Sequence, residues 1–138
     1  MRRLLSVVVS VYNEEEALAQ FYQVTEGILN TISWDYELVF VNDGSRDQSL
    51  SILNHLADSN PKVKVVSFSR NFGHEAAMIA GIDYSQGDGI ICMDADLQHP
   101  PACIPEIIRR FEDGYEVINM VRTKNESAGW FKNMASSA

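Results

Sequence analysis

Two aspartates, Asp94 and Asp96, stand one residue apart directly after the apolar run 90–93. Side chains two residues apart in an extended backbone point to the same side, so both carboxylates can face one point where a strand ends. Mg²⁺ binds few protein carboxylates and lets substrate phosphates complete its shell. The pattern therefore predicts a metal ion held against a phosphorylated ligand, with Gln98 as a third oxygen ligand. The plain alternative is an Asp-x-Asp that occurs by chance in a loop.

The charge of the chain supports a cation site and argues against a nucleic-acid partner. The formal net charge is −8, whereas proteins that bind phosphate backbones need a basic surface. Several acids cluster at predicted strand ends, among them residues 14–16, Asp43 and Asp47. Such acids repel one another unless a cation lies between them.

Length and composition are typical of one globular domain, with 138 residues, 46% of them hydrophobic and 22% charged. Cys92 and Cys103 have neither metal-ligand spacing nor a disulfide pattern, which favours a reducing cytosol. The apolar start at 4–9 is too short for a signal peptide and leads into acidic residues. No run approaches the roughly 20 apolar residues that span a bilayer, so we expect this chain to be soluble.

Apolar runs typical of buried strands alternate with segments of helical periodicity. We expect strands at 4–11, 36–41, 63–68, 90–93 and 116–121, and helices at 14–32, 45–59, 76–84 and 101–111. Acids in the first turn of helix 14–32 suit the helix dipole, and residues 45–48 fit a capping box. This alternation predicts an α/β fold, a mostly parallel sheet with helices on both faces. Ligands bind such sheets outside the carboxyl ends of the strands.

Polar residues follow the predicted strands and should meet at that edge. The first strand–helix turn is acidic and lacks the glycines with which a dinucleotide fold holds pyrophosphate. Arg70 can pair with phosphate oxygens or with a neighbouring acid. Asp43 can accept hydrogen bonds from a base or ribose, or can simply begin the next helix. His74 and His99 can act in acid–base chemistry or be exposed loop histidines.

Four blocks of sequence resemble the family-2 glycosyltransferases of GT-A fold, in particular the polyprenyl-phosphate branch with the bactoprenol glucosyltransferases and dolichyl-phosphate mannose synthases. The blocks occur in order at residues 6–15, 40–47, 69–77 and 93–101. The resemblance covers nearly all of residues 4–134. It implies a nucleotide-sugar-binding GT-A domain at 1–122, followed by a truncated tail at 123–138 that leads to a missing acceptor and membrane region.

The resemblance implies how a nucleotide sugar would be bound. Tyr12 and Glu14 would line the nucleotide pocket. Asp43 would contact the nucleobase, and Arg70 and Asp94 would lie beside the nucleotide. The expected sugar donor is UDP-glucose first and GDP-mannose second.

The resemblance also implies the metal and the acceptor. Asp94, Asp96 and Gln98 would hold Mg²⁺ or Mn²⁺, and the metal would stabilise the leaving diphosphate. The catalytic residues would be Asp94, Asp96 and Arg122, with Arg122 near the phosphate of a polyprenyl acceptor. Attack by this lipid phosphate would invert the anomeric carbon. The parent enzyme would work at the cytoplasmic face of a membrane in cell-envelope synthesis, whereas this fragment alone would transfer little sugar.

Two other functions stay open on the sequence. The chain can be a nucleotide-sugar-binding module without catalysis, or a receiver-type signalling domain in which Asp94 accepts a phosphoryl group. The tail is either a frayed terminus or a short helix with Trp130, Phe131 and Met134 on one face. Exposure of these apolar side chains would favour self-association into a homo-oligomer.

Overall fold

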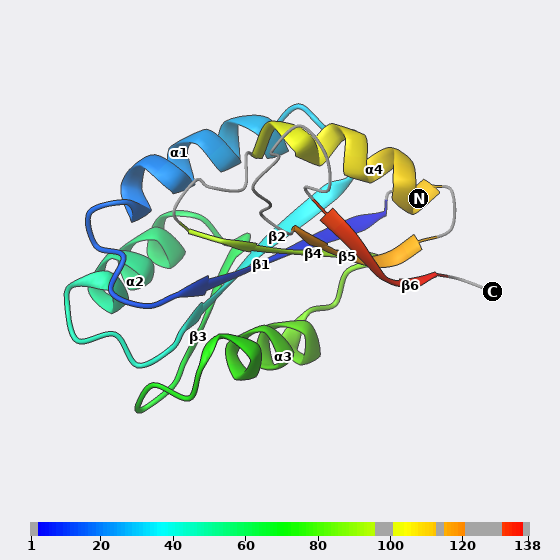
Figure 1. Cartoon of the computed structure of the whole chain (residues 1–138). Helices are drawn as coiled ribbons and strands as arrows, with labels where there is room; N and C mark the ends of the chain where they lie inside the picture. Colours follow the sequence, from blue (N-terminus) through cyan, green and yellow to red (C-terminus); the bar gives the residue numbers. More distant parts are fainter. Residues whose placement is uncertain (1–2, 96–100, 113–114, 121–130, 137–138) are drawn as a thin grey trace.

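The computed structural model describes residues 3–95, 101–112, 115–120 and 131–136 (Figure 1). The elements follow the predicted alternation of strands and helices. In chain order they are β1 (Leu4–Val11), α1 (Leu18–Leu29), β2 (Asp35–Asn42), α2 (Ser49–Ser59), β3 (Val63–Ser67), α3 (His74–Tyr84), β4 (Gly89–Asp94), a 3-10 turn (Pro101–Cys103), α4 (Ile104–Glu112), β5 (Tyr115–Met120) and β6 (Phe131–Ser136).

The six strands form one sheet in the order β3-β2-β1-β4-β5-β6. The pairs from β3 to β5 are all parallel, which confirms the predicted mostly parallel α/β fold. Strand β6 pairs antiparallel with β5, so both predictions for this part of the tail, a frayed end or a short helix, are wrong. The edge of β5 offers unpaired backbone groups, and residues 131–136 satisfy them by forming a ladder. Trp130 lies outside the described residues.

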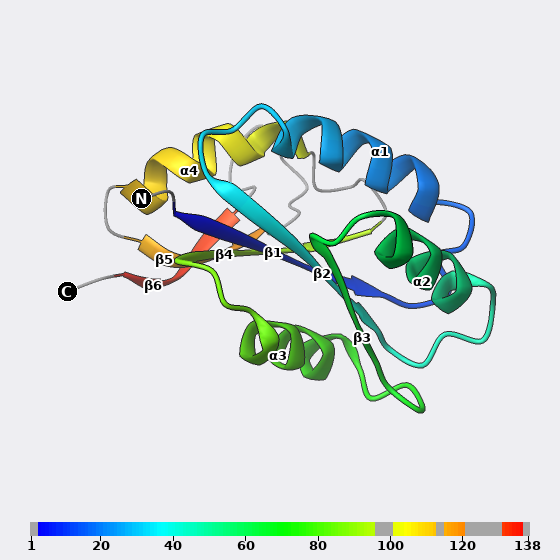
Figure 2. The same ribbon diagram turned by 180° about the vertical axis from the view of Figure 1, so that it is seen from behind.

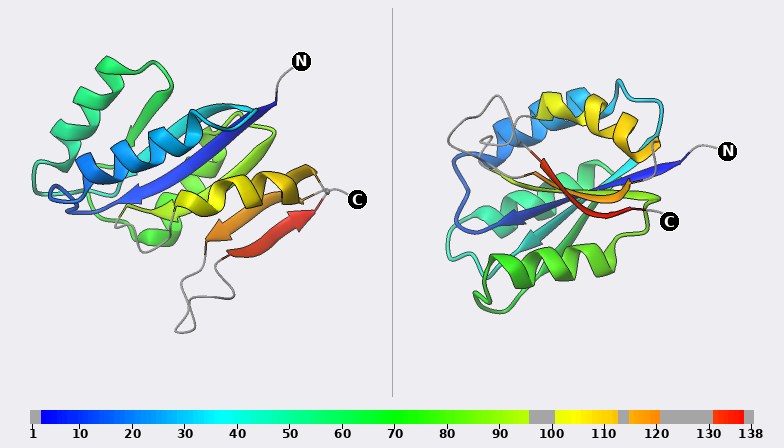
Figure 3. Two further views of the ribbon diagram at one scale, coloured as in Figure 1. Left: turned by 90° about the horizontal axis from the view of Figure 1, so that it is seen from above. Right: turned by 45° about the vertical axis from the view of Figure 1, so that its right-hand side comes forward.

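Helices cover both faces of the sheet (Figures 2 and 3). Side chains of β1 alternate between the faces: Val7 and Val9 belong to the larger buried cluster, which includes residues of α1, α2 and α4. Val8 belongs to the smaller cluster, in which it packs with Ala77 of α3. The strands are therefore buried on both sides, which explains their continuous apolar runs.

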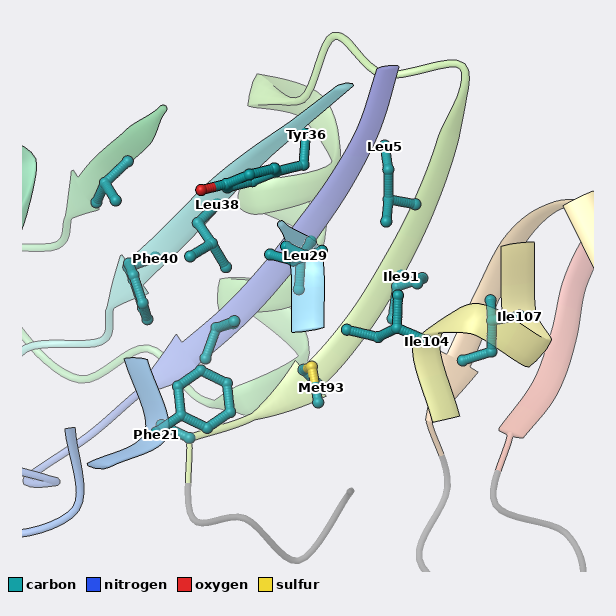
Figure 4. Packing of buried hydrophobic residues seen from close by; sticks show 14 of the residues in the cluster. Leu5, Phe21, Leu29, Tyr36, Leu38, Phe40, Ile91, Met93, Ile104 and Ile107 are labelled. Carbon is teal, nitrogen blue, oxygen red and sulfur yellow. The ribbon is translucent and has the colours of Figure 1, made fainter. Parts of the chain in front are cut away.

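The larger cluster fills the space between the sheet and the helices above it in Figure 1 (Figure 4). Phe21 of α1 meets Phe40 of β2 edge to face, with the ring centroids 6.3 Å apart. Ile104 and Ile107 anchor α4 in the same cluster. On the opposite face α3 lies very close to the sheet, because a Cβ added at Gly81 would be 2.3 Å from Cγ1 of Val8. These contacts fix the helix whose N-terminus borders the candidate site.

All four helix starts differ from the sequence prediction, and the difference is largest, four residues, for α1 and α2. Helix α1 begins at Leu18, so the acids at 14–16 lie in the turn before it and none stands in its first turn. Helix α2 begins at Ser49 without a side-chain cap, so the capping box predicted at 45–48 is wrong. Two of the side chains that suggested these features, those of Glu15 and Ser45, accept hydrogen bonds between loops instead, as described below. In the described part of the chain, no helix is long and apolar enough to cross a membrane.

Candidate functional site

The residues predicted to bind ligand lie at the carboxyl ends of neighbouring parallel strands. Tyr12 follows β1, Asp43 follows β2, and Asp94 is the last residue of β4. The register pairs Val11 with Asn42 and Ser10 with Asp94, so these strand ends are side by side. The expectation that the strand-end residues meet at one edge is therefore confirmed for the described ones.

The loops after β1 and β2 are joined by side chain to backbone hydrogen bonds. Asn13 lies at their centre, with a positive φ of 53° that allows its backbone and its side chain to bond the opposite loop. The bonds run from Asn13 N to Ser45 Oγ (2.9 Å), Arg46 N to Asn13 Oδ1 (2.8 Å), Glu14 N to Ser49 Oγ (2.9 Å), Glu15 N to Asp47 Oδ2 (3.2 Å) and Gln48 N to Glu15 Oε1 (2.8 Å). Residues that looked like local helix caps thus hold two loops together.

The hydrogen bonds to Asp47 change the pKa of its carboxyl. Desolvation raises the pKa of its carboxyl, but hydrogen bonds from the Ser49 side chain and from backbone N–H groups, including that of Glu15, together outweigh it. The pKa of Asp47 therefore lies below its ordinary value of 3.8. The ionised carboxylate is the form that the loop arrangement stabilises.

A pocket of about 360 Å³ lies between these loops and the loop after β3. It brings together Tyr12 and Arg70, two of the residues predicted to bind nucleotide. The guanidinium of Arg70 lies over the ring of Phe72, with Cζ 4.6 Å from its centroid, and no described acid forms an ion pair with it. The other lining residues are Asn42, Gly44, Ser45, Arg46, Leu50, Ser67, Phe68, Ser69 and Asn71.

Glu14 does not line this pocket. It borders a separate hollow of about 420 Å³, together with Glu15, Glu16 and Asp47. The structure therefore separates Glu14 from Tyr12 and Arg70, with which it was grouped on the sequence. Its role in nucleotide binding stays a prediction.

Asp43 is buried, with 4% of its surface exposed, and its carboxylate holds the loop before α3. Oδ1 accepts a hydrogen bond from Phe72 N (2.8 Å), and Oδ2 accepts bonds from Gly73 N (3.1 Å) and from Asn71 Nδ2 (3.2 Å). The alternative that Asp43 begins the next helix is wrong, because α2 starts six residues later, at Ser49. Contact with a nucleobase stays a prediction, for which the carboxylate has little remaining acceptor capacity.

Gly44 brings the loops after β2 and β3 into backbone contact. Its φ is +72°, and a Cβ at this position would lie 2.2 Å from the carbonyl carbon of Arg70 and 2.3 Å from the nitrogen of Asn71. Only glycine fits both the space and the backbone angle. In the sequence, the Asp43-Gly44 pair indicates a turn, but it does not show which loop the turn contacts.

Asp94 has two partners on the same carboxylate oxygen. Oδ1 accepts a hydrogen bond from Ser10 Oγ at 3.2 Å and lies 2.7 Å from Nε2 of His74. His74 was a sequence candidate, whereas Ser10 was missed because a serine within an apolar strand gives no functional signal. Oδ2 accepts no hydrogen bond from a described residue. A carboxylate with one oxygen left for ligand suits a hard cation such as Mg²⁺ or Mn²⁺.

The rest of the predicted metal site lies outside the described residues. This holds for Asp96, Gln98 and Arg122, and also for His99. Within the described ranges, no group of three His, Cys, Asp or Glu residues could hold a metal ion. The ligand set predicted from the Asp-x-Asp pattern therefore stays a prediction.

The fold is that of the GT-A glycosyltransferases. A mannosyltransferase from Pyrobaculum calidifontis, solved in complex with GDP-Man and Mn²⁺, superposes with a TM-score of 0.61 at 21% identity, over 70% of this chain and 28% of that one. Staphylococcus aureus TarS 1–349, in complex with UDP-GlcNAc, superposes with a TM-score of 0.59 at 24% identity, over 77% of this chain and 32% of that one.

The sequence profile of glycosyl transferase family 2 matches residues 6–138, and the chain belongs to this family. A Bacillus subtilis protein named uncharacterized glycosyltransferase YkcC is 46% identical over 96% of this chain and 41% of its own length. The prophage bactoprenol glucosyl transferase homolog of Escherichia coli is 42% identical over 92% of this chain and 44% of its own. The chain thus spans less than half the length of the curated relatives it matches.

Proposed function

We propose that this chain binds a nucleotide diphosphate sugar together with Mg²⁺ or Mn²⁺, as the sugar-donor part of an enzyme that glycosylates a polyprenyl phosphate with inversion. The observation that carries the proposal is the meeting of Tyr12, Arg70, Asp43 and Asp94 at one sheet edge in a family-2 glycosyltransferase. A receiver-type domain does not fit this family.

The names of relatives and neighbours support both the sugar donor and the acceptor of the proposed reaction. Relatives named bactoprenol glucosyl transferase favour glucose and a polyprenyl phosphate acceptor. A further relative is named undecaprenyl-phosphate 4-deoxy-4-formamido-L-arabinose transferase, which also fits a lipid phosphate. The structural neighbour with GDP-Man and Mn²⁺ supports a divalent metal and keeps GDP-mannose as the second choice after UDP-glucose.

In this proposal the described residues bind and orient the nucleotide. The exposed ring of Tyr12, 43% accessible, offers a stacking surface at the pocket beside Arg70. Arg70 supplies a positive charge for the phosphates. Asp94, Asp96 and Gln98 would hold the metal, which when bound stabilises the charge that develops on the leaving diphosphate.

In our proposal, sugar transfer requires the acceptor and is an activity of the whole protein. Arg122 would lie near the acceptor phosphate, and the parent protein would work at the cytoplasmic face of a membrane in envelope synthesis. Binding without transfer is the second candidate for the 138-residue chain itself, since it spans only 41–44% of relatives such as YkcC and the E. coli protein. An assay of sugar transfer to polyprenyl phosphate separates the two.

The test of the proposal is calorimetry with UDP, UDP-glucose and GDP-mannose, in Mn²⁺ and in chelator. We expect nucleotide affinity to fall at least about ten-fold in chelator and in Asp94→Ala, a loss of about 1.4 kcal/mol. Asp58→Ala is the matched control, because Asp58 is an exposed residue of α2 away from this edge. Equal affinity with and without metal would overturn the metal-dependent site.

A further inference from the structure

The contact between His74 and Asp94 is a feature that the Asp94-x-Asp96 motif alone does not predict. The imidazole Nε2 lies 2.7 Å from Asp94 Oδ1, and Ser10 Oγ donates to the same oxygen at 3.2 Å. Since an ionised carboxylate only accepts hydrogen bonds, this contact is a hydrogen bond when Nε2 carries a proton. Two donors on Oδ1 restrain the carboxylate and leave Oδ2 without a donor from the described residues.

The three side chains meet because of the sheet register and the position of α3. Ser10 of β1 pairs with Asp94 of β4, just as Val8 pairs with Cys92 two residues earlier. Val8 and Cys92 belong to the cluster under α3, so the alternation of the strands places Ser10 and Asp94 on the same face. Helix α3 begins on that face, at His74.

The backbone holds His74 in place although its ring is exposed. The preceding residue, Gly73, has a φ of 108° and donates its N–H to the buried carboxylate of Asp43. Asp43 therefore fixes the residue before His74, and His74 in turn contacts Asp94. The side chains of His74 and Asp94 are 59% and 36% accessible, as expected for groups that border an open binding site.

We propose that His74 is a positioning residue that orients the Asp94 carboxylate, with Oδ2 directed toward the metal–nucleotide. The proposal rests on the function proposed above, because it takes the ligand of Oδ2 to be the metal or the nucleotide. An exposed pair of this kind contributes little to folding stability. Its effect should therefore appear in ligand affinity and not in the stability of the fold.

The first measurement is the affinity for Mn²⁺–UDP of the wild type and three variants. His74→Ala should bind about ten-fold or more weakly, the range seen when the partner of a metal ligand is removed. His74→Gln should recover most of the affinity, because its amide N–H can replace Nε2–H. His55→Ala, an exposed histidine of α2, should match the wild type. Thermal unfolding should be the same in all four proteins.

The second measurement needs no ligand and follows the His74 ring nitrogens by ¹⁵N NMR at a pH of about 8.5, where an ordinary histidine is neutral. The wild type should show the Nε2–H tautomer, and Asp94→Ala should show a mixture. If the wild type binds no nucleotide with Mn²⁺, the proposed function fails, while the NMR result still decides whether His74 holds Asp94. If the wild type binds and His74→Ala binds equally well, or His74→Gln fails to recover, the positioning role is refuted.

Discussion

Replacing Gly44 by alanine tests the close approach of the loops after β2 and β3. The residue has a φ of +72°, and the new Cβ would lie 2.2–2.7 Å from backbone atoms of Arg70 and Asn71. The left-handed backbone costs an alanine about 1–2 kcal/mol. Forcing a methyl group into packed backbone costs about 1–3 kcal/mol more, because neither loop can move without breaking its hydrogen bonds. We expect the free energy of unfolding to fall by about 2–5 kcal/mol in total.

Alanine substitutions at two other glycines separate the backbone cost from the packing cost. Gly73 has a φ of +108° but nothing within 4 Å of a Cβ, so Gly73→Ala should show only the backbone cost. Gly27 lies inside α1 with open space around it and no positive φ. Gly27→Ala should therefore stabilise the protein by about 0.5–1 kcal/mol, since alanine is the better helix former. The expected order of stability is Gly27→Ala, wild type, Gly73→Ala and then Gly44→Ala.

Urea unfolding of the four proteins measures the order. Tryptophan fluorescence is a suitable probe, because Trp34, one of the two tryptophans, is buried and stacks on Phe111 with ring centroids 5.8 Å apart. Far-UV circular dichroism provides the second probe for a two-state test. If Gly44→Ala proved as stable as the wild type at an unchanged m-value, the backbone contact described here would be wrong.

Three further predictions follow from buried or hydrogen-bonded groups. Asp43→Ala leaves two backbone N–H groups without their acceptor and should cost about 2–5 kcal/mol in urea unfolding; an unchanged midpoint would contradict the anchoring role. Because the folded pKa of Asp47 is depressed below 3.8, its stabilising contribution is present above that pH and is lost as the pH falls through the folded pKa. The stability difference between wild type and Asp47→Asn should therefore be present near pH ~6 and vanish near pH ~2, and a difference independent of pH would refute this reasoning. Burial raises the pKa of the Cys92 thiol to about 12, so Ellman's reagent should label Cys103 in the folded protein and Cys92 only on unfolding; equal labelling rates in the native state would show that Cys92 is accessible.

The sequence was sufficient to predict the elements whose pattern is local. The apolar runs of β1, β2 and β4 gave the strands, because strands buried on both faces carry continuous apolar residues. Asp94 could be placed at a strand end for the same reason. Strand β6 was missed because Phe131–Ser136 has neither β-branched residues nor an alternating pattern, so nothing local in the sequence indicates that it pairs with β5.

Contacts between distant loops were beyond sequence reasoning. Ser45 and Gln48 have the spacing of a capping box, but Ser45 Oγ accepts from Asn13 N and the backbone N–H of Gln48 donates to Glu15 Oε1, each more than thirty residues away. Ser10 becomes a site residue only through the register that sets it beside Asp94. The order of polar residues along the chain does not show which distant group each will bond, because that depends on how the fold brings the loops and strands together.

The central place of β1 in the sheet has a consequence for how the chain folds. Its neighbours are β2 and β4, and Ser10 meets Asp94 across a separation of 84 residues. Pairing between such distant segments slows folding, because the loop must close before the contacts form. During synthesis β1 and β2 can pair early, while the other edge of β1 stays open until β4 leaves the ribosome. We therefore expect the Asp43 side of the site to form before the Asp94 side, with an apolar strand edge exposed to chaperones and to aggregation in the interval.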